Sequence, residues 1–379
     1  MKTSRFLFHS SISLCLGYSI VSSGRSFVIF ERRGAKPAAA ALVSTAFRHK
    51  YARRDARHLL PSSNLPSQIP NIMAPTYLIV GATGNTGQSV VETLSKLSTC
   101  AVIALTRSLH SPVAKHLATL PNVQVLEKNW MDITAQWLRE HEIERAFVAT
   151  PSQPSQFAEE TTFHVAALKA GVKYVVRIST TAANVRPDCE AYYPRIHWAI
   201  EALLSTPEFK PLQWTSLQAN NFSSFWLATA AEFIKQYRKT GKQDTLRLVA
   251  SEYAPVGTVD ANDVGVLAAH LLLQEDISPH NNAKYVVNGP EDITGRQIVE
   301  LVERYIGTSV DNVIFKDMSF LDYMIGVTQG SQSVLMSMKH GPETAWNGEC
   351  TASATSEAVL KLAAPTRTPA DTLKAMLQE

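Results

Sequence analysis

Three glycines, each three residues from the next, stand where an apolar run gives way to helical spacing. The apolar run is Tyr77–Val80, the turn is Gly81-Ala-Thr-Gly-Asn-Thr-Gly87, and the helical spacing continues to Leu97. The first glycine permits a tight turn, the second lets the backbone approach a pyrophosphate, and the third lets the helix pack closely on the sheet. The amino end of such a helix attracts phosphate. We therefore predict a dinucleotide site with these residues: Gly81, Thr83, Gly84, Asn85, Thr86 and Gly87.

After this turn, short β-branched apolar runs alternate with longer stretches of helical spacing, which is typical of βαβ units. The fold class predicted is α/β, with a doubly wound parallel sheet of the Rossmann type. The predicted strands are 77–80, 101–106, 123–126, 146–150, 174–179 and 214–217, and the predicted helices between them are 87–97, 113–120, 137–141, 156–170 and 197–204. Gly171 follows one helix at the position that favours a left-handed cap.

The chain of 379 residues exceeds what one core usually supports, about 250–300 residues. We predict that residues 73–379 form the working domain, with a Rossmann core over about 76–220. The alternation is less regular beyond it, with helices expected at 225–237, 264–273 and 294–306 and a strand at 285–288. These elements predict a smaller carboxy-terminal α/β lobe, which lines the substrate site, over about 221–379.

Residues 1–72 are rich in Arg, Ser and Ala, and their only acids are Glu31 and Asp55. We interpret them as a disordered basic leader, either a mitochondrial transit segment or an extension without function. A secretory signal around Phe6–Val21 is the least favoured interpretation, because His9 and several serines interrupt the run. Met73 resembles an ordinary protein start. The expected location is the cytoplasm, or the mitochondrion if the leader is a transit segment.

Charge and cysteine usage exclude several classes of function. Without the leader the remaining chain is net acidic, so we expect no nucleic-acid partner. No apolar stretch of roughly 20 residues occurs, so we expect no membrane span. The four cysteines lie far apart without a C-x-x-C pair, so neither a zinc site nor a disulfide framework is indicated, and we expect no metal.

The residues after the second predicted strand indicate which dinucleotide binds. An acid there would bind the ribose of NAD, whereas a cation would accept the 2′-phosphate of NADP. The segment Ile103–Ser108 contains no acid, and Arg107 can form charge-assisted bonds to a phosphate. The sequence favours NADP as the cofactor over NAD.

Several segments together resemble the NmrA-like group of atypical short-chain dehydrogenases/reductases, over about Tyr77 to Met376. Besides the glycine turn they are Thr106-Arg-Ser108, Asn129-Trp-Met-Asp132, Val172-Lys-Tyr-Val-Val-Arg-Ile-Ser179, His197-Trp-Ala-Ile-Glu201, Gln218-Ala-Asn-Asn-Phe222, Val259-Asp-Ala-Asn-Asp-Val264 and Val287-Asn-Gly-Pro-Glu-Asp-Ile-Thr294. The resemblance implies that Asp132 lies near the adenine and that Thr150 and Pro151 lie beside the nicotinamide. Members of this group include quinone and enal reductases, reductases of fungal secondary metabolism, and regulators that bind NADP without turnover.

The candidate catalytic residues depart from the usual pattern. Typical short-chain dehydrogenases use Tyr-x-x-x-Lys, in which lysine lowers the pKa of the tyrosine that donates a proton. Here the match is Tyr193-Pro-Arg-Ile-His197, with histidine in place of lysine and Pro194 inside the spacing. Histidine has an ordinary pKa near neutrality and could donate a proton, and Ser179 could polarise a carbonyl. The alternative is that Tyr193 and His197 only pack or cap the helix.

Other side chains favour structural roles. His164 is expected to be a partly exposed helical residue rather than a ligand. Phe222, Phe225 and Trp226 are expected in the core, and Asp260 and Asp263 are expected to cap the helix that follows them.

The predicted function is an NADP(H)-dependent oxidoreductase that reduces a small hydrophobic carbonyl, enone, imine or quinone, with fungal secondary metabolism as its setting. The alternative is a non-catalytic NADP-sensing regulator, which would act through a protein partner. The sequence leaves the substrate and the oligomeric state open.

Overall fold

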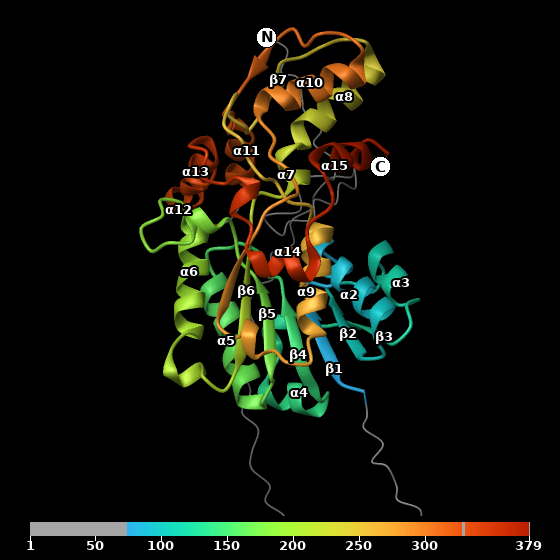
Figure 1. Cartoon of the computed structure of the whole chain (residues 1–379), viewed down its shortest axis with the longest axis vertical. Coiled ribbons are helices and arrows are strands. Elements are labelled where there is room, and N and C mark those ends of the chain that lie inside the picture. The colour runs from blue at the N-terminus through green and yellow to red at the C-terminus, as the bar shows by residue number, and fades with distance from the viewer. Residues whose placement is uncertain (1–73, 328–329, 379) are drawn as a thin grey trace, which may run out of the picture. The chain divides into compact units, whose positions relative to one another are not determined.

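Seven parallel strands form the main sheet of this computed structural model, which describes residues 74–327 and 330–378 (Figure 1). The predicted leader, residues 1–72, lies outside the described residues. The strand order is β3-β2-β1-β4-β5-β6-β8, which confirms the predicted doubly wound sheet. The strands are β1 (Thr76–Val80), β2 (Ala101–Thr106), β3 (Val123–Glu127), β4 (Ile143–Val148), β5 (Tyr174–Ile178), β6 (Gln213–Ala219) and β8 (Ala283–Val287).

Helices cover both faces of this sheet, so its central strands are apolar on both sides. One face carries α2 (Asn85–Leu97), α3 (Pro112–Leu117), α9 (Ala261–Leu272) and α14 (Glu357–Ala363). The other face carries α4 (Ala135–Glu140), α5 (Gln156–Ala170) and α6 (Tyr192–Leu204). Gly171 ends α5 with φ +82°, as its position in the sequence predicts.

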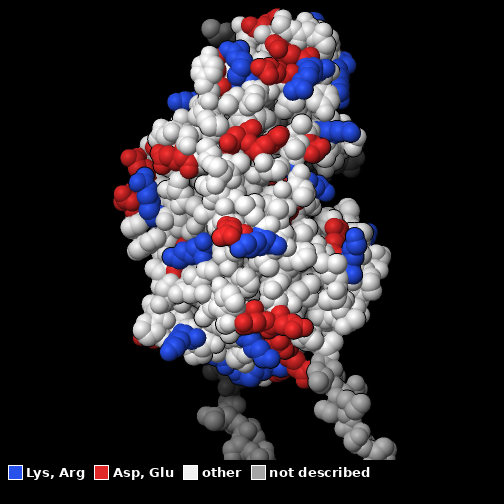
Figure 2. All heavy atoms as spheres, viewed as in Figure 1, with Lys and Arg blue, Asp and Glu red and all other residues white. Residues whose placement is uncertain are grey.

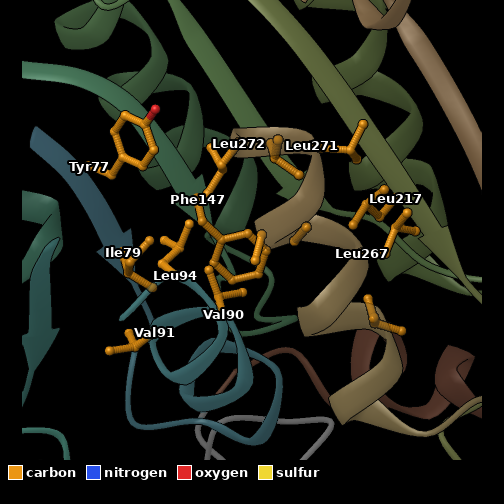
Figure 3. Packing of buried hydrophobic residues seen from close by; sticks show 14 of the residues in the cluster. Tyr77, Ile79, Val90, Val91, Leu94, Phe147, Leu217, Leu267, Leu271 and Leu272 are labelled. Carbon is orange, nitrogen blue, oxygen red and sulfur yellow. The ribbon is translucent and has the colours of Figure 1, made fainter. Parts of the chain in front are cut away.

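Alternate side chains of each strand enter opposite cores, because successive residues of a strand point to opposite faces. Leu78 of β1 packs in the core beneath α5 and α6. Its neighbour Ile79 packs in the core beneath α2 and α9 (Figure 3). Phe147 of β4 lies in this second core between Leu94 of α2 and Leu267 of α9 in the view of Figure 3.

Helices α2 and α9 lie unusually close together. A Cβ on Gly265 of α9 would stand 2.5 Å from the carbonyl oxygen of Thr86, so only glycine permits this approach. The Ser89 hydroxyl of α2 donates to the carbonyl oxygen of Asn262 at 2.8 Å. The helix that follows the glycine turn is therefore fixed by a segment far along the chain.

A third core lies above the sheet in Figure 1 and includes Trp226, Leu248 and Ile298. Its elements are α7 (Ser223–Trp226), α8 (Ala228–Thr240), α10 (Gly295–Ile306), α15 (Pro369–Met376) and the parallel pair β7 (Leu246–Arg247) and β9 (Val313–Ile314). The segments α11 (Ser319–Val327), α12 (Gln332–Met336) and α13 (Glu343–Trp346) lie beside α6 and α7 in Figure 1.

The lobe is not one continuous segment from residue 221, as the sequence suggested. Strand β8 pairs with β6 and extends the main sheet, and α9 packs against α2 on its face. The chain therefore leaves the sheet after β6 and returns to it for α9 and β8, since both elements carry apolar residues that complete the core beneath α2.

Basic and acidic side chains are interspersed over the face shown in Figure 2. A surface of mixed sign on that face creates no extended field of one charge. Within the described residues, no helix combines the length and the apolar character needed to cross a membrane.

Candidate functional site

The glycine turn joins β1 to α2, and at its first and third glycines the backbone leaves no room for a side chain. Gly81 has φ +81°, and a Cβ on it would stand 2.6 Å from the carbonyl oxygen of Ala149. A Cβ on Gly87 would stand 2.1 Å from the carbonyl oxygen of Gly81. The first and third glycines are thus required by the turn itself and by the packing of α2.

The amino end of α2 faces the carboxyl ends of the strands. Gly84 occupies its N-cap position, and no side chain within the described residues caps this end. The first helical hydrogen bond runs from the Gln88 N–H to the Gly84 carbonyl oxygen at 2.8 Å, which leaves the N–H groups of the first turn for a ligand. Gly84 and Asn85 are exposed. This cradle fits an anion such as a pyrophosphate.

The strand order also favours a ligand here. It reverses direction between β1 and β4, and in open α/β sheets ligands bind outside the carboxyl ends of the strands at such a switch point. The structure brings Gly81, Thr150 and Ser179 to one edge, because they follow the neighbouring parallel strands β1, β4 and β5.

Arg107 and Asp132 lie on the β2 and β3 side of this edge. Arg107 is exposed directly after β2, and Asp132 is exposed in a short 3-10 turn after β3. Glu127, which sequence reasoning did not connect with this loop, lies beside it in the structure. Its carboxylate accepts a hydrogen bond from the Leu109 N–H at 2.9 Å. Glu127 thereby restrains the loop that carries Arg107.

Thr150 and Pro151 are half-buried after β4. The Thr150 hydroxyl donates to Glu160 Oε2 at 2.7 Å and accepts from Gln156 Nε2 at 3.0 Å. Both partners lie on α5, so the first turns of that helix fix the threonine side chain.

Behind Thr150 lies a buried polar cluster, which we define as Glu160, Arg177, His197, Glu201 and Ser216. Arg177 of β5 is 0% exposed and Glu160 is 1% exposed. The guanidinium donates from Nε to Glu160 Oε1 at 2.6 Å, from Nη1 to Ser216 Oγ at 2.9 Å, and it bonds His197 Nδ1 through Nη2 at 2.8 Å. The Ser216 hydroxyl donates to Glu201 Oε1 at 2.6 Å.

Burial and the charge of Arg177 determine the protonation states of Glu160 and His197 in this cluster. Burial alone would raise the pKa of Glu160, but the charge of Arg177 and the hydrogen bond from His164 outweigh it and hold that pKa well below its usual range. Burial, helped by the charge of Arg177, lowers the pKa of His197 to about 3. At neutral pH Glu160 is therefore ionised and His197 is uncharged.

This arrangement corrects two expectations about histidines. The prediction that the pKa of His197 lies near neutrality is wrong, because Nδ1 faces a guanidinium donor and the ring is buried. The expectation that His164 is partly exposed is also wrong, because it is fully buried 3.3 Å from Glu160. Sequence reasoning missed Glu160 and Arg177. The signal that could have found them is an arginine among the apolar residues of a predicted inner strand, because such a residue needs a buried partner.

Helix α6 begins at Tyr192, earlier than the sequence suggested. Pro194 then lies in the first turn, where its missing N–H removes no helical hydrogen bond, so Tyr193 and His197 keep the spacing of one helix turn. Tyr193 is half-buried, and its hydroxyl lies against Gly341. Ser179 is buried at the end of β5, and its hydroxyl has no hydrogen-bond partner within the described residues.

The remaining candidates have structural roles. Asp260 caps α9 by accepting from the Asn262 N–H, as expected, whereas Asp263 accepts from the Thr366 and Arg367 N–H groups. Trp226 is fully buried, while Phe222 and Phe225 are half-buried. No cluster of three His, Cys, Asp or Glu residues that could hold a metal ion occurs in the described part of the chain.

Comparison with known proteins matches most of the chain to one family and to two reductases. The model of the NmrA-like family matches residues 73–358. The (4-alkanoyl-5-oxo-2,5-dihydrofuran-3-yl)methyl phosphate reductase of Streptomyces griseus is 25% identical over 232 residues, which cover 61% of this chain and 73% of that protein. The NAD(P)H azoreductase of Xenophilus azovorans is 24% identical over 246 residues, which cover 62% of this chain and 74% of that protein.

Solved structures share the fold. The NADPH complex of a quinone oxidoreductase from Escherichia coli has a TM-score of 0.61 at 20% identity and covers 79% of this chain and 99% of its own. NmrA, a negative transcriptional regulator, has a TM-score of 0.59 at 16% identity and covers 80% of this chain and 96% of its own.

Proposed function

The chain belongs to the NmrA-like family, and within that family we propose that it is an NADP(H)-dependent oxidoreductase acting on a small hydrophobic carbonyl, enone, imine or quinone. The observation that carries this proposal is the uncapped amino end of α2 at the switch point between β1 and β4. The reductases among its sequence relatives support it. A setting in fungal secondary metabolism stays a prediction.

In this proposal the cofactor supplies hydride, and the chain binds and orients it. The first turn of α2 holds the pyrophosphate, Arg107 pairs with the 2′-phosphate, and Asp132 lies on the adenine side. Thr150 and Pro151 lie on the nicotinamide side. For the substrate, Ser179 polarises the reacting group and Tyr193 donates the proton, whereas His197 acts only through Arg177, because it is uncharged and buried.

We expect Arg107→Ala to weaken NADPH binding far more than NADH binding, because only NADPH carries the 2′-phosphate. One charge-assisted contact predicts a loss of about ten- to a hundred-fold for NADPH. Titration of both dinucleotides by calorimetry measures the two changes. Equal losses for both, or no loss, would show that Arg107 does not read the phosphate.

We expect Tyr193→Phe to lower turnover by roughly a hundred-fold or more while leaving NADPH affinity unchanged, because general acid catalysis contributes about that much. The assay follows NADPH oxidation with a panel of quinones, enals, cyclic imines and aromatic ketones. Tyr253→Phe is the matched control, because Tyr253 is 72% exposed. Turnover that survives the change at Tyr193 removes this residue from the reaction.

A second function is favoured by the structural similarity to a transcriptional regulator. The protein would then bind NADP without turnover, and its binding to a protein partner would depend on whether NADP is bound. Tight NADPH binding without turnover of any acceptor in the panel, together with a partner whose binding depends on the dinucleotide, would support this function over the reductase.

A further inference from the structure

Thr150 adjoins the switch point directly. The Ala149 N–H donates to the Val80 carbonyl oxygen at 3.2 Å, and the Ala149 carbonyl oxygen is the atom that a side chain at Gly81 would strike. The residues after β4 therefore lie directly beside the glycine turn. Arg107 and Asp132 lie on the other side of the turn, after β2 and β3, so a dinucleotide whose adenosine half lies there extends its nicotinamide half toward β4.

The hydrogen-bond partners of Thr150 leave it only one role toward a ligand. A hydroxyl group has one hydrogen to donate and two lone pairs that accept. The hydrogen goes to Glu160 Oε2, and one lone pair accepts from Gln156 Nε2. What remains is one lone pair on a half-buried side chain, so Thr150 can accept a hydrogen bond from a ligand and cannot donate one.

Glu160 determines that the Thr150 hydroxyl donates its hydrogen to the carboxylate and not to a ligand. Arg177 Nε donates to its Oε1 at 2.6 Å, and His164 Nε2 lies 3.3 Å from the same oxygen. Gln156 Nε2 donates to Oε2 at 3.1 Å. A carboxylate surrounded by these donors is itself an acceptor only, so it always takes the threonine hydrogen.

We propose that Thr150 Oγ1 accepts a hydrogen bond from the carboxamide N–H of the nicotinamide, and that Glu160 is the positioning residue that makes it an acceptor. The carboxamide is the only N–H donor on this ring, so an acceptor here distinguishes the two ends of that group and orients the ring. This inference rests on the proposed function, since it requires that the dinucleotide bind at the switch point.

An analogue of NADP⁺ in which acetyl replaces the carboxamide tests the proposal, because a methyl group then stands where the N–H₂ would be. Calorimetric titration of NADP⁺ and of this analogue gives one affinity ratio for each variant. The wild type should prefer NADP⁺ by about five- to ten-fold, the size of one neutral hydrogen bond. Thr150→Val should bring the ratio close to one, and Thr150→Ser should restore the preference.

Two further variants make the result specific. Thr161→Val is the matched control, because the Thr161 hydroxyl bonds only carbonyl oxygens of its own helix, and it should keep the wild-type ratio. Glu160→Gln should lower the ratio as Thr150→Val does, because an amide N–H₂ facing Thr150 would turn the threonine hydrogen toward the ligand. Thermal unfolding checks that each variant is folded.

The outcomes separate this inference from the proposed function. A wild-type ratio in Thr150→Val, with NADP⁺ still bound tightly, would overturn the role of Thr150 and leave the proposed function standing. A wild type that binds neither dinucleotide would overturn both.

Discussion

Gly87→Ala is expected to abolish dinucleotide binding and to destabilise the fold. The new Cβ would stand 2.1 Å from the Gly81 carbonyl oxygen and 2.7 Å from its carbonyl carbon. Both are backbone atoms of the turn, so α2 must move away from β1. We expect NADPH affinity to fall by more than about a hundred-fold, equivalent to roughly 3 kcal/mol. Calorimetric titration and thermal unfolding measure the two effects.

Gly84→Ala is the matched comparison. Its Cβ would stand 3.3 Å from the Gly81 carbonyl oxygen, a tight contact that a shift of a few tenths of an ångström relieves, and the residue is exposed. The same methyl group stands at the amino end of α2, where the phosphates would lie. We expect thermal stability near that of the wild type with clearly weaker NADPH binding. If both variants bind NADPH as the wild type does, the glycine turn is not the phosphate site.

Arg177→Met is expected to cost about 3–5 kcal/mol of unfolding free energy, because it leaves the buried Glu160 carboxylate without its partner. Urea unfolding at pH 7 measures the loss. The matched control is Arg247→Met, since the ion pair of Arg247 with Asp317 is half-exposed on the arginine side. Surface pairs contribute about 0–1 kcal/mol, so a loss at Arg177 no larger than at Arg247 would contradict the assigned role.

The pH dependence of that loss has a defined sign. In the wild type Arg177 keeps the pKa of Glu160 well below its usual range, so the stability it contributes is present above the unfolded pKa and is lost as pH falls. Without Arg177, burial raises the pKa of Glu160, so the favourable protonated form is lost as pH rises. The difference in unfolding free energy between wild type and Arg177→Met should therefore grow from about pH 5 to pH 8.

The sequence predicted the fold where the signal is local. The glycine turn, the strand Ala101–Thr106 and the helix Gln156–Ala170 lie where periodicity and turn residues place them. Predicted helix boundaries were wrong where they depend on residues that the apolar periodicity does not mark. Helix α9 begins at Ala261 because Asp260 caps it, and the predicted helix 225–237 is interrupted at Leu227, which separates α7 from α8.

The site was predictable only in part, because its residues come together from separate elements. The phosphate cradle is continuous in sequence, and so it could be recognised. The contact of Glu160 with Arg177 joins α5 to β5 across the packed interior, and the approach of Tyr193 to Gly341 joins two lobes. Neither has a periodic signature, because each depends on how helices settle on the sheet.

The contact between α2 and α9 also bears on how the protein is made. Ser89 and Asn262 are 173 residues apart, yet their hydrogen bond and the close approach at Gly265 seat the helix that follows the glycine turn. At a synthesis rate of about 5–20 residues per second, Asn262 leaves the ribosome roughly 9 to 35 s after Ser89. During this interval the first βα unit is complete, but the side of α2 that packs against α9 is uncovered. A ribosome-bound chain that ends before residue 261 therefore lacks the contacts of α9 that hold α2 at the glycine turn.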